Sequence, residues 1–204
     1  MKKFVFLFLC LFVVCTGAFA SGKKENANTV AITGGYQGSF YKFTSEGVEW
    51  KNTYHGLGIG IDIREMFTDI VGLYGHIGVN LPMAARYSSG NFSSDYKRSD
   101  FNSLFGMEIY IGPAFMPIKQ EKLTLNVSPV LHFGMLMAKN SLDDSGLGMI
   151  GLGADVSVDY YFAEKFFLTA GVLASFDFLQ ILGNDYSSPM NFLIKPKLGI
   201  GFRW

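Results

Sequence analysis

The chain closes with the stretch NFLIKPKLGIGFRW, residues 191 to 204, in which two kinds of residue take turns. The even-numbered positions from Phe192 to Trp204 are all apolar. The odd-numbered positions from Lys195 to Arg203 are basic residues or glycines. Because successive side chains of a β-strand point to opposite faces, a repeat of two residues predicts a strand with one apolar and one polar face.

Seven segments upstream show the same alternation, at residues 29–37, 57–64, 71–81, 105–115, 123–133, 150–162 and 166–178. The links between segments alternate in length, with short ones at 65–69, 117–122 and 163–165 and long polar ones at 38–53, 83–102, 136–147 and 179–191. This layout is typical of outer-membrane barrels, which have short periplasmic turns and longer extracellular loops. The sequence therefore predicts an all-β fold, an eight-stranded antiparallel up-and-down transmembrane β-barrel with four longer extracellular loops.

A soluble β-sandwich is the main competing fold, because its strands alternate too, with the apolar face inside and a polar outer face. Here one face is almost purely Leu, Ile, Val and Phe, and the other mixes glycine with charged and hydroxyl residues. Small, glycine-rich faces suit a narrow barrel interior, and continuous apolar faces suit lipid. Aromatic residues near the strand ends are candidate interfacial girdles: Tyr160, Phe162, Phe166, Phe202 and Trp204 at one end, Phe105, Phe176, Phe178 and Phe192 at the other.

The first 20 residues have the three parts of a secretory signal peptide: a basic start, the apolar run Phe4–Val14, and the small residues Ala18 and Ala20 around a cleavage site. We expect removal of residues 1–20, a short polar tail at 21–27 and the barrel at 28–204. Lipoprotein processing at Cys15 is the competing interpretation, but the residue before it, Val14, is not the small one expected there.

Composition removes other classes of protein. The chain has 17 basic and 17 acidic residues, so it lacks the basic excess of a nucleic-acid-binding protein, and we expect no nucleic-acid partner. Cleavage removes both cysteines, Cys10 and Cys15, which excludes a disulfide-stapled secreted module. After residue 20, no apolar run approaches the ~18–20 residues of a spanning helix.

The C-terminal stretch from Leu198 to Trp204 resembles the closing strand of outer-membrane β-barrel proteins, which ends in alternating apolar residues and a terminal aromatic. With the signal peptide and the eight strands, the chain is similar to the small barrels typified by OmpX, OmpW and the OmpA membrane domain, without a motif that selects one of them. The resemblance implies the bacterial outer membrane, its lipid as surroundings, and the barrel-assembly machinery and periplasmic chaperones as partners during biogenesis. Phe202 and Trp204 are then the C-terminal assembly signal.

The polar strand faces carry a set of charged residues of both signs. Five acids and four bases share the inward side and form the predicted lumen charge network: Asp62, Glu108, Asp155, Asp159 and Asp177 with Arg64, Lys195, Lys197 and Arg203. Charges inside a barrel must be paired or hydrated. An eight-stranded barrel is just wide enough to be filled by its own side chains, which favours a plugged lumen over a channel whose selectivity these charges tune.

Signs of an enzyme are weak. His76 and His132 share the inward face, but they lie 56 residues apart with no acidic or cysteine cluster at ligand spacing. Some eight-stranded barrels modify lipid A, yet no His-x-Ser arrangement supplies a nucleophile here. The glycine-rich stretches 56–60 and 146–153 lack the Gly-Lys-Ser/Thr continuation of a phosphate loop. We therefore expect no enzyme, no metal and no cofactor.

The long loops are the other candidate for function, because exposed aromatic and basic residues are common contact anchors. The contact candidates are Trp50, Tyr87, Phe92, Tyr96, Lys97 and Arg98. Capping the barrel or entering the lipopolysaccharide layer is the competing role for the aromatic ones. The hypothesis is thus a non-enzymatic outer-membrane barrel acting in envelope structure, or in contact with a host or surface ligand. A narrow porin-like channel, or an OmpW-like path for small solutes, is the alternative.

Overall fold

The computed structural model describes residues 28–45, 48–139, 144–182, 185–187 and 191–204. The predicted signal peptide and the tail at 21–27 lie outside these residues. Eight long strands form the barrel: β1 (Thr29–Ser45), β2 (Val48–Met66), β3 (Val71–Ser89), β5 (Ser103–Lys119), β6 (Leu123–Lys139), β7 (Asp144–Tyr161), β8 (Phe166–Leu182) and β10 (Asn191–Arg203). Two short strands, β4 (Phe92–Lys97) and β9 (Asp185–Ser187), and the 3₁₀ turn η1 (Arg98–Asp100) are added at one end.

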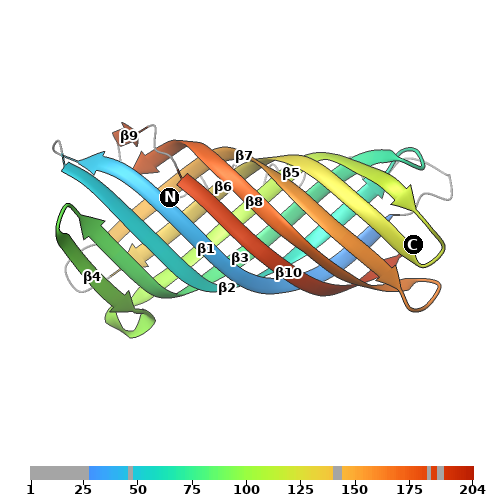
Figure 1. Ribbon diagram of the computed structural model, residues 1–204, viewed down its shortest axis with the longest axis horizontal. Helices are drawn as coiled ribbons and strands as arrows, with labels where there is room; N and C mark the ends of the chain where they lie inside the picture. The colour runs from blue at the N-terminus through green and yellow to red at the C-terminus, as the bar shows by residue number, and fades with distance from the viewer. Residues whose placement is uncertain (1–27, 46–47, 140–143, 183–184, 188–190) are drawn as a thin grey trace.

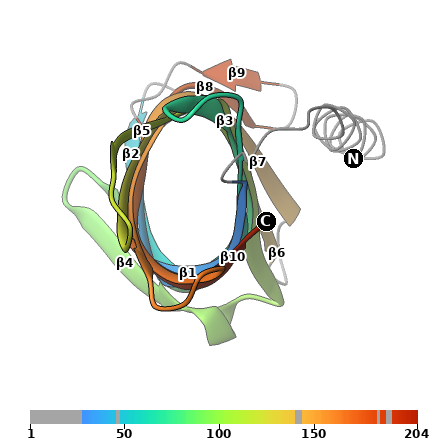
Figure 2. The same cartoon turned by 90° about the vertical axis from the view of Figure 1, so that its right-hand side faces the viewer.

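The sheet closes on itself. Each barrel strand pairs antiparallel with its neighbours in the order β1-β2-β3-β5-β6-β7-β8-β10. β10 then pairs with β1, from Thr29 opposite Arg203 to Phe40 opposite Phe192. Seen along its axis, the barrel is an oval ring, and the β3–β4 hairpin lies outside it (Figure 2). The predicted all-β, eight-stranded antiparallel barrel is confirmed.

The two faces of the strands separate as the alternation predicts. In β2, Gly58, Gly60, Asp62 and Arg64 are buried, whereas Leu57, Ile59 and Ile61 are about half exposed, at 54%, 60% and 47%. In β10, Lys195 and Lys197 are buried and Leu198 is 69% exposed. Polar residues therefore face the interior and an apolar belt faces outward, the arrangement of a membrane-spanning barrel and the reverse of a soluble one.

Glycines on the inner face make room for large neighbours. A Cβ on Gly60 would lie 2.4 Å from His76 Cε1, and one on Gly201 would lie 2.1 Å from Phe167 Cζ. By contrast, a Cβ on Gly75, at an outward-facing position of β3, would meet nothing within 4 Å. The glycines of the polar faces thus create the space that the buried side chains fill.

The connections at one end are short, as predicted. Backbone hydrogen bonds close them, from Phe67 N to Val71 O, from Gln120 N to Leu123 O, and from Ala163 N to Phe166 O. The described chain ends meet at this end, where Trp204 N donates to Asn28 O. We refer to it as the turn end, and to the opposite end as the loop end (Figure 1).

The loop end differs from the prediction in the length of its strands. The link predicted at 38–53 is mostly strand, because β1 runs on to Ser45 and β2 begins at Val48. Within the link predicted at 83–102, β3 continues to Ser89 and turns back as β4, with Gly90 in the turn at a φ of 54°. Barrel strands of 13 to 19 residues exceed the ~9–11 that cross a bilayer, so the barrel wall extends beyond the membrane. Both faces are in water there, so the alternation of polarity fades although the strand continues.

No part of the described chain forms a helix that is long and apolar enough to cross a membrane.

Candidate functional site

The centre of the lumen holds a chain of buried ion pairs. The Asp62 carboxylate lies 2.5 Å from His76 Nδ1, and the other ring nitrogen of His76 lies 3.3 Å from Glu108 Oε1. Glu108 also accepts a hydrogen bond from Lys195 Nζ at 2.6 Å. His76 can donate to both carboxylates only as the imidazolium cation, because a neutral ring has a single N–H. The four side chains come from β2, β3, β5 and β10, so this cluster joins opposite walls of the barrel.

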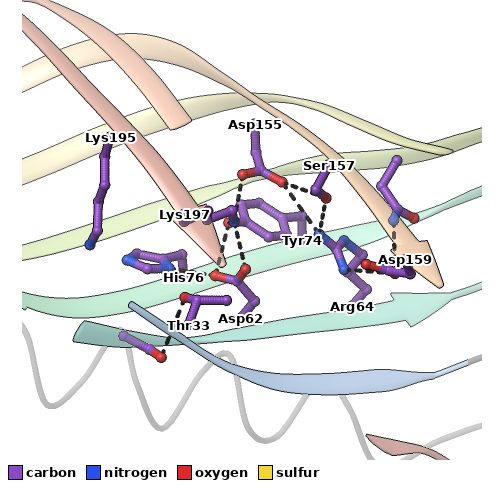
Figure 3. Close-up of polar contacts among 12 residues, drawn as sticks. Thr33, Asp62, Arg64, Tyr74, His76, Asp155, Ser157, Asp159, Lys195 and Lys197 are labelled. Atoms are coloured by element: carbon purple, nitrogen blue, oxygen red, sulfur yellow. Dashed lines mark hydrogen bonds and ion pairs between the residues drawn. The ribbon is translucent and has the colours of Figure 1, made fainter. Parts of the chain in front are cut away.

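The chain of ion pairs continues toward the turn end (Figure 3). Lys197 Nζ lies 2.6 Å from both Asp62 Oδ2 and Asp155 Oδ2. Arg64 then bridges Asp155, at 3.3 Å, and Asp159, at 3.4 Å. Hydroxyl and amide groups complete the site: Tyr74 donates to Asp62, Arg64 donates to Ser157, and Asn126 donates to Asp159. These charged side chains are at most 2% exposed, so the ion pairs form away from bulk water.

A second, smaller cluster lies nearer the loop end. His132 Nδ1 is 2.5 Å from Asp177 Oδ1 and 3.3 Å from Ser175 Oγ, and the His132 ring stacks on Tyr110 with centroids 4.4 Å apart. A catalytic triad needs the acid and the nucleophile on different nitrogens of the histidine. Here both face the same nitrogen, so the geometry does not match a Ser-His-Asp nucleophile.

Arg203 lies apart from the charged residues grouped with it by sequence. Its guanidinium group is at the turn end, where it donates to Glu164 O at 2.7 Å and lies 4.5 Å from the centre of the Tyr161 ring. The other eight residues of the predicted network lie in the two clusters above. Two tyrosines, Tyr74 and Tyr110, belong to the clusters but were not singled out from the sequence, although they share the inward parity of His76 and Glu108.

The buried carboxylates outnumber the permanent cations of the two clusters, and His76 narrows the difference. Five carboxylates face three permanent cations in the two clusters, since Arg203 lies outside them. His76, between two carboxylates, supplies a fourth positive charge. Burying unpaired charge is costly, so this near balance is what a packed lumen requires.

Little empty space remains between these side chains. At the loop end, a cavity of about 20 Å³ is lined by Gln37, Asn80, Glu108 and His132 among others, and another of about 10 Å³ adjoins Gln37 and Asn80. One water needs roughly 10–15 Å³. Each of these cavities is therefore of the size that holds one or a few isolated waters.

Interior layers on either side of the ion pairs are apolar, which the sequence did not indicate. Tyr41, Tyr54, Leu104, Leu136 and Met149 pack together toward the loop end. At the turn end, Ala31, Tyr161 and Phe167 form a smaller cluster. The buried charges therefore lie between two groups of buried, mostly apolar side chains.

The predicted loop contacts occupy two kinds of position. Phe92 is 58% exposed and Tyr96 is 37% exposed, both on β4, and Lys97 is exposed beside them. Tyr87 is half-buried and its hydroxyl pairs with that of Tyr54 at 2.8 Å. Arg98 is tied to the backbone through a hydrogen bond to Leu104 O. Trp50 lies on β2, half-buried, beyond the apolar belt.

Two exposed ion pairs lie on the wall that carries these residues. Lys42 Nζ is 2.6 Å from Glu49 Oε2, and this hydrogen bond lowers the pKa of the Glu49 carboxyl. Arg86 binds Asp95 with two hydrogen bonds of 2.5 and 2.9 Å and lowers the pKa of the Asp95 carboxyl.

Within the described residues, no group of three or more His, Cys, Asp or Glu side chains is arranged to hold a metal ion. At the C-terminus, Phe202 packs edge-on against Phe166 with ring centroids 5.3 Å apart, and Trp204 is 55% exposed. Both residues lie at the turn end of the outer surface.

No protein-family model matches the chain, and no curated protein does either. Several solved structures, in contrast, are similar to this chain. Neisserial surface protein A superposes with a TM-score of 0.58 at 15% identity, covering 90% of this chain and 100% of that one. The outer membrane protein OprG from Pseudomonas aeruginosa superposes with a TM-score of 0.53 at 12% identity, covering 88% of this chain and 97% of that one. The outer membrane protease OmpT from Escherichia coli superposes with a TM-score of 0.50 at 9% identity, covering 90% of this chain and 98% of that one.

These similar structures include surface and outer-membrane proteins and one protease, so the likeness concerns architecture rather than activity. The closed sheet, the polar interior and the apolar exterior agree with it at every strand. This chain has the eight-stranded β-barrel fold of small bacterial outer-membrane proteins.

Proposed function

We propose that this protein is a non-enzymatic barrel of the outer membrane whose lumen is closed to ions, and that it acts through its loop end, in envelope structure or surface contact. The observation that carries the closed lumen is the line of ion pairs from Lys195 to Asp159, which crosses the interior between opposite walls. To open a path, an ion would have to displace charges that neutralise one another at 2.6 to 3.4 Å.

Single-channel recording tests the closed lumen. The protein, with its folded state verified by a gel shift on boiling, is inserted into a planar bilayer. We expect no steady current from the wild type. Reproducible conductance that changes in a Glu108→Gln or Lys197→Met variant would instead support the alternative, a narrow channel tuned by the lumen charges.

The loop-end extension supports a role in contact. β3 and β4 form a hairpin outside the ring (Figure 2), and the aromatic side chains of Phe92 and Tyr96 are exposed on it. Aromatic residues supply much of the binding energy at protein interfaces. Their ligand, a host or surface molecule, would meet them without any opening of the barrel.

A paired substitution tests this role. Phe92→Ser with Tyr96→Ser should reduce binding of protein-bearing cells to host cells or matrix at least about tenfold, since each lost aromatic anchor typically costs more than 1 kcal/mol. Phe67→Ser, which removes an aromatic side chain that is 56% exposed at the opposite end, is the matched control. Full binding by the double variant would refute a contact through this hairpin.

For biogenesis, we propose that the outer-membrane assembly machinery recognises Phe202 and Trp204, after delivery by periplasmic chaperones. Phe202 lies on the outward face of the last strand and Trp204 directly follows that strand, so both are accessible before the barrel closes. Deleting Trp204 should slow the appearance of the heat-modifiable folded form in cells while refolding in detergent stays unchanged. Equal slowing in both settings would point to a folding defect instead.

A further inference from the structure

One wall of the barrel differs from the rest just above the apolar belt. On β1 to β4, four outward-facing positions carry cations, and we call Lys42, Lys51, Arg86 and Lys97 the basic strip. The strand register brings them together: Lys42 lies opposite Lys51, while Arg86 lies opposite Thr53 on β2, the next outward position after Lys51. Lys97 extends the strip onto β4, opposite Ala84.

The strip keeps a positive balance, and its side chains are exposed. Lys42, Lys51 and Arg86 are 46%, 65% and 62% exposed. Among the described outward-facing residues at the loop end of β1 to β4, two carboxylates, Glu49 and Asp95, oppose the four cations, which leaves a net charge of +2. Long basic side chains at this level can reach along the surface while their stems cover apolar neighbours.

Next to the strip, on the side nearer the apolar belt, three outward-facing rings lie together. We call Tyr36, Phe40 and His55 the ring shelf. The Tyr36 hydroxyl is 2.7 Å from His55 Nδ1, and the two rings stack with centroids 5.9 Å apart. Phe40 meets His55 edge-on at 6.2 Å. Below the shelf, the outward positions of β2 are apolar from Leu57 to Ile63. An imidazole on the membrane side of a barrel is costly unless it contacts something polar, and so marks a candidate site.

Among the residues whose side chains the structure describes, the remaining wall has no such feature. At the loop end of β5 to β10, the outward positions are apolar up to Phe105, Met137, Phe178 and Phe192. Lys139 is the one outward-facing base there among the residues that the structure describes. The combination of cations, polar ring pair and apolar wall is therefore confined to one side of the barrel.

We propose that this wall binds the phosphate-bearing headgroup of an outer-leaflet lipid. The acyl chains would lie against the apolar positions of β2, the ring shelf would contact the ester or sugar region, and the basic strip would bind the phosphates. Lysine and arginine form strong charge-assisted hydrogen bonds with phosphate, and basic clusters at a membrane surface bind anionic headgroups. The β3–β4 hairpin, which carries Arg86 and Lys97 of the strip, stands away from the ring (Figure 2). This site is independent of the closed lumen and of the contact through Phe92 and Tyr96.

Titration with a matched pair of lipids tests the proposal. The full-length protein, expressed and matured in outer membranes and extracted in mild detergent, is titrated with bisphosphorylated lipid A and with dephosphorylated lipid A, and bound lipid is counted by native mass spectrometry. We expect preferential binding of the phosphorylated form, weakened by added salt because exposed charges are screened. Equal binding of both forms would overturn the proposal.

Two variants locate the site. Because each cation near an anionic surface strengthens binding about fivefold, the triple change Lys42→Gln, Lys51→Gln and Arg86→Gln should weaken phosphorylated lipid A binding at least about tenfold. The control removes three bases at the turn end, Lys119→Gln, Lys122→Gln and Lys165→Gln, and should leave binding unchanged. Equal loss in both variants would show that net charge alone, and not this wall, attracts the lipid.

Two further measurements complete the test: a substitution in the ring shelf, and competition by inorganic phosphate. His55→Leu keeps the outer surface apolar, so the barrel should fold, but it should weaken binding of phosphorylated lipid A a few fold. Inorganic phosphate at millimolar concentration should not displace the lipid, because it lacks the acyl chains. Displacement by inorganic phosphate would show a site for free phosphate instead of a lipid, and unchanged binding in His55→Leu would remove the shelf from the site.

Discussion

Replacing Lys197 by methionine removes the ammonium group on which the centre of the lumen depends. Its Nζ lies 2.6 Å from Asp62 Oδ2 and 2.6 Å from Asp155 Oδ2, and all three side chains are at most 1% exposed. Methionine has a similar length and volume, so the change tests the charge more than the packing. After the substitution, two carboxylates remain in the lumen without their shared cation.

The expected cost follows from the partners that remain. Removing one partner of a buried ion pair typically costs about 3–5 kcal/mol, because the other charge stays buried. Asp62 keeps His76 and Tyr74, and Asp155 keeps Arg64 and Ser157, so we expect the lower end, about 3 kcal/mol near neutral pH.

The free energy of unfolding is measured by urea titration in lipid vesicles, followed by the fluorescence of Trp50 and Trp204 and by the gel shift of the folded form. Lys42→Met serves as the control, because it breaks an exposed ion pair with Glu49 and should leave stability unchanged. If the free energy of unfolding of Lys197→Met is within about 0.5 kcal/mol of the wild-type value, water must already solvate these carboxylates. The proposed lumen, closed by tightly paired charges, would then be wrong.

Further predictions concern the inner glycines and the loop end. Gly60→Val should prevent His76 from taking its place and destabilise the barrel by about 1–3 kcal/mol or more, whereas Gly75→Ala, facing outward into open space, should be tolerated in the same urea titration. The pKa of the Asp95 carboxyl, lowered by Arg86, should return toward its ordinary value in Arg86→Gln, as followed by NMR titration. Because that pKa is lower in the folded state, the pair's contribution is present above the ordinary range of Asp and is lost as the pH falls through the lowered value. An Asp95 titration that Arg86→Gln leaves unchanged would show that the ion pair does not persist in solution.

Much of the fold was predictable because it depends on local order along the chain. Leu57, Ile59 and Ile61 alternate with Gly58, Gly60 and Asp62, and the structure places the first set outside and the second inside. The same holds for Lys195 and Lys197 against Leu198. The predicted loops were too long, since β1 and β2 continue as strands above the membrane, where water contacts both faces and removes the contrast that reveals a strand.

The grouping of the charged residues was less predictable. Parity along each strand correctly assigned Asp62, Glu108 and Asp155 to the interior, but it could not say at what height each would lie. Arg203 has the same parity as Lys197 and yet lies at the turn end, beside Tyr161. The sequence did not predict the basic strip for a similar reason. Lys42, Lys51 and Arg86 are separated in sequence, and only the strand register brings them together.

The sequence by itself determined the strands, their two faces and the side from which the chain ends emerge, because side-chain alternation is a property of each strand alone. Only the closed sheet decided which charges meet. Lys197 and Asp62 are 135 residues apart, and Lys195 and Glu108 are 87 apart. Ion pairing depends on distances of a few ångströms across the lumen, and these distances are set by the stagger of eight strands closing into one ring.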